Sequence, residues 1–367
     1  MKAFVAARAL IALLAVACRA APAAPVSASS AKAPTSLLPS AVPSAPAAQL
    51  VAKSLPLPGA SGNAFLDYIA YERGARRVWV PVGSTGSVDV LDTTAGSFTR
   101  IDGFQTVQRD AHGQVRTMGP SAVSVGDGVV YVGNRGTSEV CVIDVRTLKL
   151  GKCLKLPAPI DGVVYVAATK EVWVTAPHDG KLFVIDASKP AQPEAKTIIP
   201  LAGEPEGYAV DESRGLFYTN LEDQGGTVVI DVKTHHPRAT WSAGCNADGP
   251  RGIGVDEARN LLVVACTDHL QVLDAGHDGA RLGALDTGAG VDNIELLATK
   301  KLVYVAAGKA ARLTIARLDD GGQLAVVATA ATSPGARNPV ADEAGNTYVA
   351  DSRASRILAF DVHALGL

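Results

Sequence analysis

Short apolar stretches that each end in a polar residue recur along most of this chain. Seven of them close at residues 90–92, 142–144, 184–186, 229–231, 272–274, 315–317 and 359–361, with Asp last in six and Arg317 in the other. The closing residues lie 52, 42, 45, 43, 43 and 44 positions apart. Within each interval, apolar residues alternate and are separated by clusters of Gly, Asp and Asn. This pattern predicts short antiparallel strands joined by tight turns.

The period and the strand content together predict the fold. In the fourth interval, four strands are expected near residues 208–210, 216–219, 227–231 and 239–241. Repeats of about 40–45 residues with four strands are typical of β-propeller blades. The sequence therefore predicts an all-β, seven-bladed β-propeller with four-stranded antiparallel blades over residues 49–367.

The last interval has no fourth strand of its own. Its third strand is expected near residues 356–362, close to the end of the chain, whereas residues 50–59, before the first repeat, resemble a fourth strand. We expect this N-terminal strand to complete the last blade, because a closed ring removes unpaired sheet edges.

Several repeats share a motif in their second and third strands. It reads Phe217-Tyr218-Thr219-Asn220 with Val228-Val229-Ile230-Asp231, Val130-Tyr131-Val132-Gly133-Asn134 with Val142-Ile143-Asp144, and Tyr348-Val349-Ala350-Asp351 with Phe360-Asp361. This unit resembles the repeat of the YVTN-type β-propellers, an extracytoplasmic family. The resemblance implies the fold and an extracytoplasmic location, but no activity, because members share fold far more than function. Arg317 departs from the motif and predicts a different turn in the sixth repeat.

The N-terminal segment predicts export. Lys2 and Arg8 precede an apolar run at residues 9–17 that ends in small residues, which is typical of an export signal over residues 1–17 cut near Ala17 or Ala20. Residues 18–48 are rich in Ala, Pro and Ser and are expected to be a disordered tether. Cys18 is a candidate lipid anchor; the alternatives are that it leaves with the signal or that the protein is freely secreted. The expected location is periplasmic, outer-membrane-anchored or extracellular, with no transmembrane segment in the mature chain.

Four cysteines follow the signal, and in an oxidising compartment an even number favours disulfides. Cys141 and Cys153 are equidistant from a predicted hairpin turn and should face each other across two strands. Cys245 and Cys266 should meet at one rim of the ring. The alternative for the second pair is a metal site formed by Cys266 with His269, whose spacing suits metal ligands.

Charge and motifs exclude several function classes. All 36 acidic residues but only 30 of the 34 basic residues lie beyond Gln49, so the folded region carries a net charge of −6. A mildly acidic domain without a basic tract argues against nucleic acid as a partner. The sequence also lacks motifs for covalent haem, a serine-hydrolase elbow, a zinc protease, a phosphate loop and a calcium loop. No cofactor is predicted, although a divalent metal is possible.

The predicted binding site lies at one mouth of the central channel. Aligning the repeats on their second strands brings one residue of each blade to this mouth: Asp67, Ser121, Asp161, Glu206, Arg251, Asn293 and Arg337. A ring of mixed charge is a candidate ligand site. The alternative is that these groups pair with one another and with channel water.

Neighbouring loops add a rim to this face. The predicted rim residues are Arg109, His112, Asn134, His178, Glu222, His269 and Asp351, with Arg135, Asp179 and Asp268 in the same turns. The 52-residue interval leaves extra residues at 105–118, which form either a lid over the channel or a β-hairpin excursion. Two histidines and several carboxylates on one face could hold a divalent metal, or they could be solvated turn residues.

The sequence favours a non-enzymatic binding or scaffolding domain, expected as a monomer, that binds a protein, peptide or small molecule at the channel mouth. One alternative is a metal-assisted lyase or lactonase-like hydrolase at the channel, with Glu206, His178, Glu222 and His269 as its nearest candidates. A second alternative is a periplasmic partner of a redox enzyme. No residue matches a known catalytic motif closely enough to be assigned a catalytic role.

Overall fold

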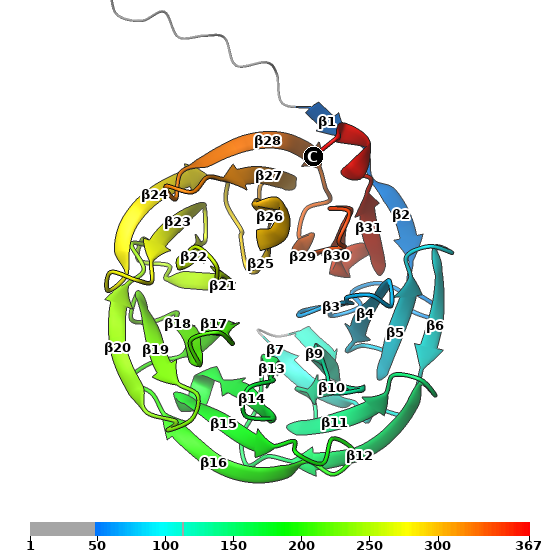
Figure 1. The fold of residues 1–367 in the computed structure, drawn as a ribbon. Helices are drawn as coiled ribbons and strands as arrows, with labels where there is room; N and C mark the ends of the chain where they lie inside the picture. Colours follow the sequence, from blue (N-terminus) through cyan, green and yellow to red (C-terminus); the bar gives the residue numbers. More distant parts are fainter. Residues whose placement is uncertain (1–47, 112–113) are drawn as a thin grey trace, which may run out of the picture. The chain divides into compact units, whose positions relative to one another are not determined.

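Seven four-stranded antiparallel sheets form a ring around a central axis in this computed structural model (Figure 1), which describes residues 48–111 and 114–367. The strands of each blade are given from the axis outward. Blade 1 consists of β3 (Ala70–Glu72), β4 (Arg77–Val82), β5 (Ser87–Asp92) and β6 (Ser97–Ile101), and blade 2 of β9 (Pro120–Gly126), β10 (Val129–Asn134), β11 (Glu139–Asp144) and β12 (Lys149–Lys155). Blade 3 consists of β13 (Val163–Val166), β14 (Glu171–Ala176), β15 (Lys181–Asp186) and β16 (Glu194–Pro200), and blade 4 of β17 (Pro205–Asp211), β18 (Leu216–Leu221), β19 (Gly226–Asp231) and β20 (Pro237–Ser242). Blades 5 to 7 consist of β21 (Pro250–Asp256), β22 (Leu261–Cys266), β23 (His269–Asp274) and β24 (Ala280–Asp286); β25 (Ile294–Leu297), β26 (Leu302–Ala307), β27 (Arg312–Leu318) and β28 (Leu324–Ala331); and β29 (Arg337–Ala341), β30 (Thr347–Asp351), β31 (Arg356–Phe360) and β2 (Lys53–Pro56). Short 3₁₀ turns lie at η1 (Pro177–Asp179), η2 (Ala298–Lys300), η3 (Ser352–Ala354) and η4 (His363–Leu365). The predicted seven-bladed propeller is confirmed.

The N-terminal strand closes the ring as predicted. β2 pairs antiparallel with β31 and supplies the outermost strand of blade 7. A further strand that the sequence did not predict, β1 (Ala48–Leu50), pairs parallel with β28 and adds a fifth strand to blade 6. The predicted export signal, Cys18 and the predicted tether up to residue 47 lie outside the described residues. Within the described ranges, no helix has the length and apolar character needed to cross a bilayer.

The recurring Asp at the end of each third strand caps the turn that follows it. The Asp144 carboxylate accepts hydrogen bonds from the backbone N–H groups of Arg146 (3.0 Å) and Thr147 (2.8 Å), and Asp231 accepts equivalent bonds from Lys233 and Thr234. Such Asx turns are local, so each repeat specifies its own turn. In blade 6, where Arg317 replaces Asp, β27 continues to Leu318 and Asp319 accepts the bonds instead. The sixth turn therefore differs, as the sequence predicted.

Aromatic side chains on the second strands fill the spaces between blades. Trp79, Tyr131, Trp173, Tyr218 and Tyr304 are all fully buried and come from β4, β10, β14, β18 and β26. Their common position in the repeat explains why the packing recurs around the ring. Trp241, in contrast, lies on the outermost strand of its blade and is only partly buried.

Both predicted disulfides are present. Cys141 and Cys153 lie opposite each other on β11 and β12, with Cα atoms 3.9 Å apart, and Cys245 pairs with Cys266 at 5.3 Å. The alternative metal site at Cys266 and His269 is wrong, because the disulfide occupies the Cys266 sulfur.

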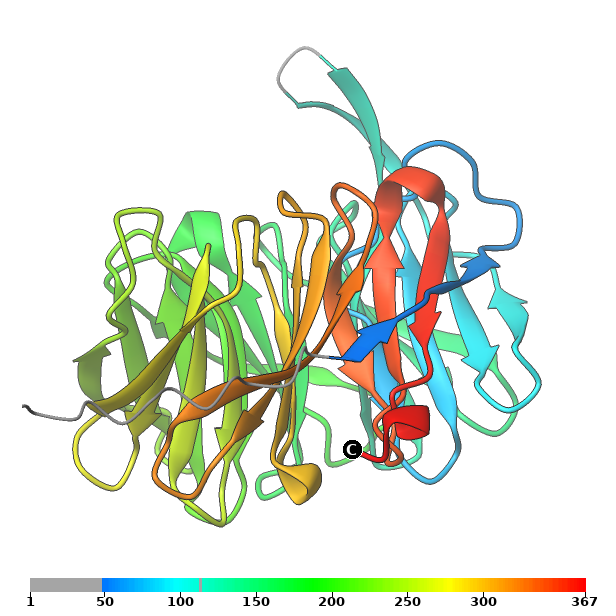
Figure 2. The ribbon, with the colours of Figure 1, turned by 90° about the horizontal axis from the view of Figure 1, so that it is seen from above.

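The extra residues between blades 1 and 2 form a β-hairpin. Its strands, β7 (Val107–Ala111) and β8 (Gln114–Met118), pair only with each other in the described residues and project from one face of the ring (Figure 2). His112, one of the predicted rim residues, lies outside the described residues. Of the two interpretations of this insertion, the structure shows the hairpin excursion.

Candidate functional site at the channel mouth

A cavity of about 410 Å³ lies at the channel mouth, on the face from which the hairpin projects. It is built from the connections that lead into the inner strands and from the turns between second and third strands. Five of the seven predicted mouth residues line it, namely Asp67, Asp161, Glu206, Arg251 and Arg337. In total, six carboxylates and four arginines surround the cavity, together with His178. The mouth is therefore densely charged and leans acidic.

Two predicted mouth residues do not line this cavity. Ser121 is fully buried on β9, where its carbonyl accepts the Tyr68 N–H at 2.9 Å. Asn293 faces a second cavity in the channel, and Asp292 occupies the mouth in its place. One backbone bond and one side-chain bond set the register: the Gly252 N–H donates to the Asp292 carbonyl (2.7 Å), and the Asn293 N–H donates to the Asn338 side-chain Oδ1 (3.1 Å).

The predicted rim residues separate into two groups. Arg109, His178 and Glu222 line the mouth cavity. Asn134 and Asp351 are buried in their own turns and do not line it: Asn134 donates to the Gln105 carbonyl (2.9 Å), and Asp351 pairs with Arg356 at 2.7 Å. His269 does not line it either, and its Nδ1 lies 2.5 Å from Asp268.

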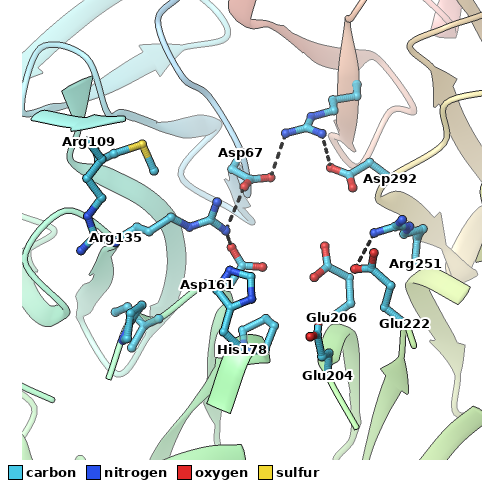
Figure 3. A pocket seen from close by; sticks show the side chains of 15 residues that line it. Asp67, Arg109, Arg135, Asp161, His178, Glu204, Glu206, Glu222, Arg251 and Asp292 are labelled. Atoms are coloured by element: carbon cyan, nitrogen blue, oxygen red, sulfur yellow. Dashed lines mark ion pairs between the residues drawn. The ribbon is translucent and has the colours of Figure 1, made fainter. Parts of the chain in front are cut away.

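Arg135 holds two blades together at the mouth. Its guanidinium bridges Asp67, at 3.4 Å, and Asp161, which it contacts closely (Figure 3). On its other side Asp67 pairs with Arg337 at 3.8 Å, and Arg337 also pairs with Asp292 at 3.2 Å. The resulting chain of alternating charges runs around part of the mouth. The sequence placed Arg135 in a turn but gave no sign of this bridging role.

Asp67 is the buried centre of this chain. Asn338 donates a hydrogen bond to its carboxylate at 2.9 Å. Burial raises the pKa of Asp67, and the nearby guanidinium groups of Arg337 and Arg135 oppose that rise. The carboxylate of Asp292 in turn raises the pKa of Arg337. These groups compensate one another, so this side of the mouth is structurally self-contained.

Glu206 differs from the other acids that project into the centre of the mouth. It lies at the start of β17, and the neighbouring Arg251 pairs with Glu222 at 2.5 Å rather than with Glu206 (Figure 3). Within the described residues, the Glu206 carboxyl has no hydrogen bond or ion pair. Burial, followed by the charges of Asp292, Asp67 and Glu222, raises its pKa to about 8, against the opposing effect of Arg251.

The backbone holds Glu206 close to the next blade. A Cβ atom built on Gly207 would lie 2.2 Å from the carbonyl oxygen of Arg251, so only glycine allows blades 4 and 5 to approach this closely beside the mouth. Gly207 follows Glu206 directly in the sequence, as Gly252 follows Arg251. The proximity of Glu206 to four other charged groups was not visible there.

The donor atoms at the mouth do not fit a metal centre. His178, Glu206 and Glu222 line one cavity, but their ligand atoms do not converge, and His269 points elsewhere. Across residues 48–111 and 114–367, the one set of His, Cys, Asp and Glu ligand atoms that lies close together is Glu139 with Cys141 and Cys153, whose sulfurs form a disulfide.

Two tyrosines cross the channel next to the mouth. Tyr68 from blade 1 and Tyr208 from blade 4 stack with ring centroids 5.6 Å apart, and the Tyr208 hydroxyl donates to the Val163 carbonyl at 3.0 Å. They also line a second cavity of about 290 Å³ with Asn293 and Glu295. Burial raises the pKa of Glu295 to about 7, and Arg73, 3.4 Å away, opposes this rise.

Comparison with known proteins identifies the fold and no family. No family model and no curated protein matches the sequence. Among solved structures, the chain is similar to U3-55K (10% identity, TM-score 0.67, covering 85% of this chain and 98% of that one) and to the β-propeller domain of Cps50 (Swd1) from Myceliophteria thermophila (12%, 0.64, 83% and 98%). It is also similar to a chain of hydrazine synthase from Kuenenia stuttgartiensis (15%, 0.66, 83% and 98%). At these identities the likeness shows the propeller fold alone, and the resemblance to YVTN-type repeats stays a prediction.

Proposed function

We propose that this protein is an exported binding protein whose channel mouth holds a cationic group of a peptide or small-molecule ligand at Glu206. The observation that carries this proposal is the unpaired Glu206 carboxyl at the centre of the mouth, where each arginine that reaches the centre already has a carboxylate partner. A partly buried acid without a partner is costly, and a ligand cation would supply the partner.

The surrounding charges favour this choice of ligand. Glu206 lies near the carboxylates of Asp292, Asp67 and Glu222, which raise its pKa. The same carboxylates create a negative potential that attracts an ammonium or guanidinium group. Glu204, two residues before Glu206, adds a further carboxylate without an ion pair among the described residues. The cavity of about 410 Å³ is large enough for a small organic cation or one amino-acid side chain.

A metal-assisted lyase or hydrolase is not favoured, because its candidate residues His178, Glu206, Glu222 and His269 do not converge on one point. The residues that line the mouth neither support nor oppose a role as the partner of a redox enzyme. Propellers commonly act as binding modules, which agrees with a recognition role.

The test compares matched probes at pH 8.5, where Glu206 is largely ionised. Cadaverine and agmatine carry cations, whereas 1,5-pentanediol has the shape of cadaverine without its charge. We expect the cations to bind wild-type protein in isothermal titration calorimetry, the diol not to bind, and Glu206→Gln to lose cation binding while Glu204→Gln keeps most of it. Equal binding of the diol, or no saturable binding of either cation at millimolar concentration, would overturn the proposal.

We propose export on the basis of residues 1–17. Intact mass measurement of the protein purified from the envelope or medium distinguishes the routes. Cleavage after Ala17 with a diacylglycerol mass on Cys18 indicates a lipid anchor, and an unmodified chain starting after Ala17 or Ala20 indicates free secretion. A full-length chain that retains residues 1–17 would contradict export.

A further inference from the structure

A third cavity, of about 420 Å³, opens on the same face beside the mouth. It shares Arg251, Asp292 and Arg337 with the mouth cavity and extends away from it over blades 5, 6 and 7. Arg116 of the hairpin, Lys309 and Arg353 complete its charged lining, and we call these three residues the basic triad. Asp292, the one acidic residue in this lining as described, is already paired with Arg337.

The basic triad has no counter-charge in the described part of the chain. Arg116, Lys309 and Arg353 are exposed, and none of them makes an ion pair or a side-chain hydrogen bond there. Most other arginines around the mouth are paired: Arg135 with two aspartates and Arg251 with Glu222. Three cations that line one cavity without an ion-pair partner among the described residues favour an anionic occupant.

Three glycines form the floor of this cavity. Gly308 donates its N–H to the Gly290 carbonyl at 2.8 Å, and Gly335 donates to the Gly308 carbonyl at 2.7 Å. These bonds tie blades 5, 6 and 7 together. A Cβ atom on Gly290 would lie 2.4 Å from the Lys309 backbone nitrogen, and one on Gly335 would lie 3.0 Å from Arg353 Nε. The glycines thus keep the floor open beneath the basic side chains.

The repeat structure shows how the two cations on the blades arise. Lys309 and Arg353 are each the second residue after the second strand, in blades 6 and 7. In blades 4 and 5, the same position holds Asp223 and Asp268. One position of the repeat is therefore acidic on one side of the ring and basic on the other.

We propose that the basic triad, together with Arg337, forms an anion-binding pocket for a carboxylate or phosphate group. Guanidinium groups offer paired N–H donors that match both kinds of oxyanion, and the Lys309 ammonium adds a point charge. This pocket goes beyond the cation site at Glu206 and does not depend on it, because the triad takes no part in that site.

The experiment titrates two polyanions, pyrophosphate and tricarballylate, into the folded protein at low ionic strength and follows binding by calorimetry. We expect one saturable site, and the tighter of the two probes identifies phosphate or carboxylate as the preferred chemistry. Lys309→Gln combined with Arg353→Gln should weaken binding at least about tenfold, since two charged contacts are lost. All three triad side chains are exposed, so these variants should fold normally.

Two controls make the result specific. Lys149→Gln combined with Lys152→Gln removes the same charge from the outer strand β12, away from the cavity, and should leave affinity within about twofold. Glu206→Gln should also leave anion binding intact, which separates this pocket from the proposed cation site. Absence of saturable binding of both probes up to about 10 mM, or equal weakening by the β12 variant, would overturn the proposal.

Discussion

Replacing Glu206 with Gln should stabilise the protein at high pH and leave its stability nearly unchanged at low pH. Glutamine has the shape of a protonated glutamic acid and cannot ionise. In the folded protein the pKa of Glu206 is raised from its ordinary value of 4.5 to about 8. Between these values the folded state holds a proton that the unfolded state has released, so wild-type stability falls as the pH rises.

The magnitude follows from the same difference in pKa. At about 1.4 kcal/mol for each tenfold change in proton affinity, the ceiling is about 4–5 kcal/mol above pH 8. Glu206 borders an open cavity, and Arg251 lies close enough to reorient toward it, so solvent and rearrangement reduce this ceiling. We expect about 1–3 kcal/mol at pH 9. For a domain of this size, that corresponds to a rise in Tm of about 2–6 °C.

The assay is thermal unfolding of wild type, Glu206→Gln and Glu204→Gln at pH 5 and pH 9. Glu204→Gln removes a carboxylate from the same cavity and controls for a general change in rim charge. The difference between Glu206→Gln and wild type should grow by several degrees from pH 5 to pH 9, and that of the control should grow less. A Glu206→Gln effect that is equal at both pH values, or a loss of stability at pH 9, would refute the partly buried, unpaired state of this carboxyl.

Three further predictions concern the framework. Deleting residues 48–57, which contain β1 and β2, should lower the Tm of the whole ring in calorimetry. Blades 6 and 7 would both lose their outermost strand. An unchanged Tm would contradict closure of the ring by β2. Arg135→Leu should lower the free energy of unfolding, measured in urea at pH 7, by about 2–4 kcal/mol, because Asp67 and Asp161 lose their shared cation. This loss should shrink at low pH, where the two acids become protonated. Asp231→Ala should cost about 1–2 kcal/mol at pH 7; the turn N–H groups, that of Thr234 foremost, lower the folded pKa of Asp231 below its ordinary value of 3.8, so the difference should shrink as the pH falls below 3.8, and a cost that does not decrease there would exclude the Asx turn as its cause.

The fold was predictable because its signals are local and repeated. Each Asp that closes a third strand caps its own turn, and most second strands carry a buried aromatic residue at the same position, so one repeat is enough to recognise the others. Arg317 broke the pattern and marked the one turn that shifts by two residues. β1 carried no such signal, because three residues that add to the edge of another blade leave no periodicity of their own.

The site was less predictable because it depends on contacts between blades. Alignment on second strands fixes the mouth only to within one residue, and Asn293 was placed where Asp292 lies because hydrogen bonds to neighbouring blades set that register. The sequence also gives no information on which charges pair. Arg135 and Asp161 are 26 positions apart, and Arg337 and Asp67 are 270 apart, yet these pairs decide which carboxyl is left without a partner.

Which charged side chains form ion pairs, more than how many there are, therefore distinguishes a surface that can bind a ligand from one that only stabilises the propeller. The mouth has six carboxylates and four arginines, and most of them neutralise one another across blade boundaries, which stabilises the ring without leaving anything for a ligand. Among the described residues without an ion pair are Glu206 and its neighbour Glu204 at the mouth, and the basic triad beside it. These uncompensated groups of opposite sign lie in adjoining cavities that share Arg251, Asp292 and Arg337. A ligand that carries both a cation and an anion would satisfy the two sides together, and its affinity for wild type should then exceed that of either single-charge probe.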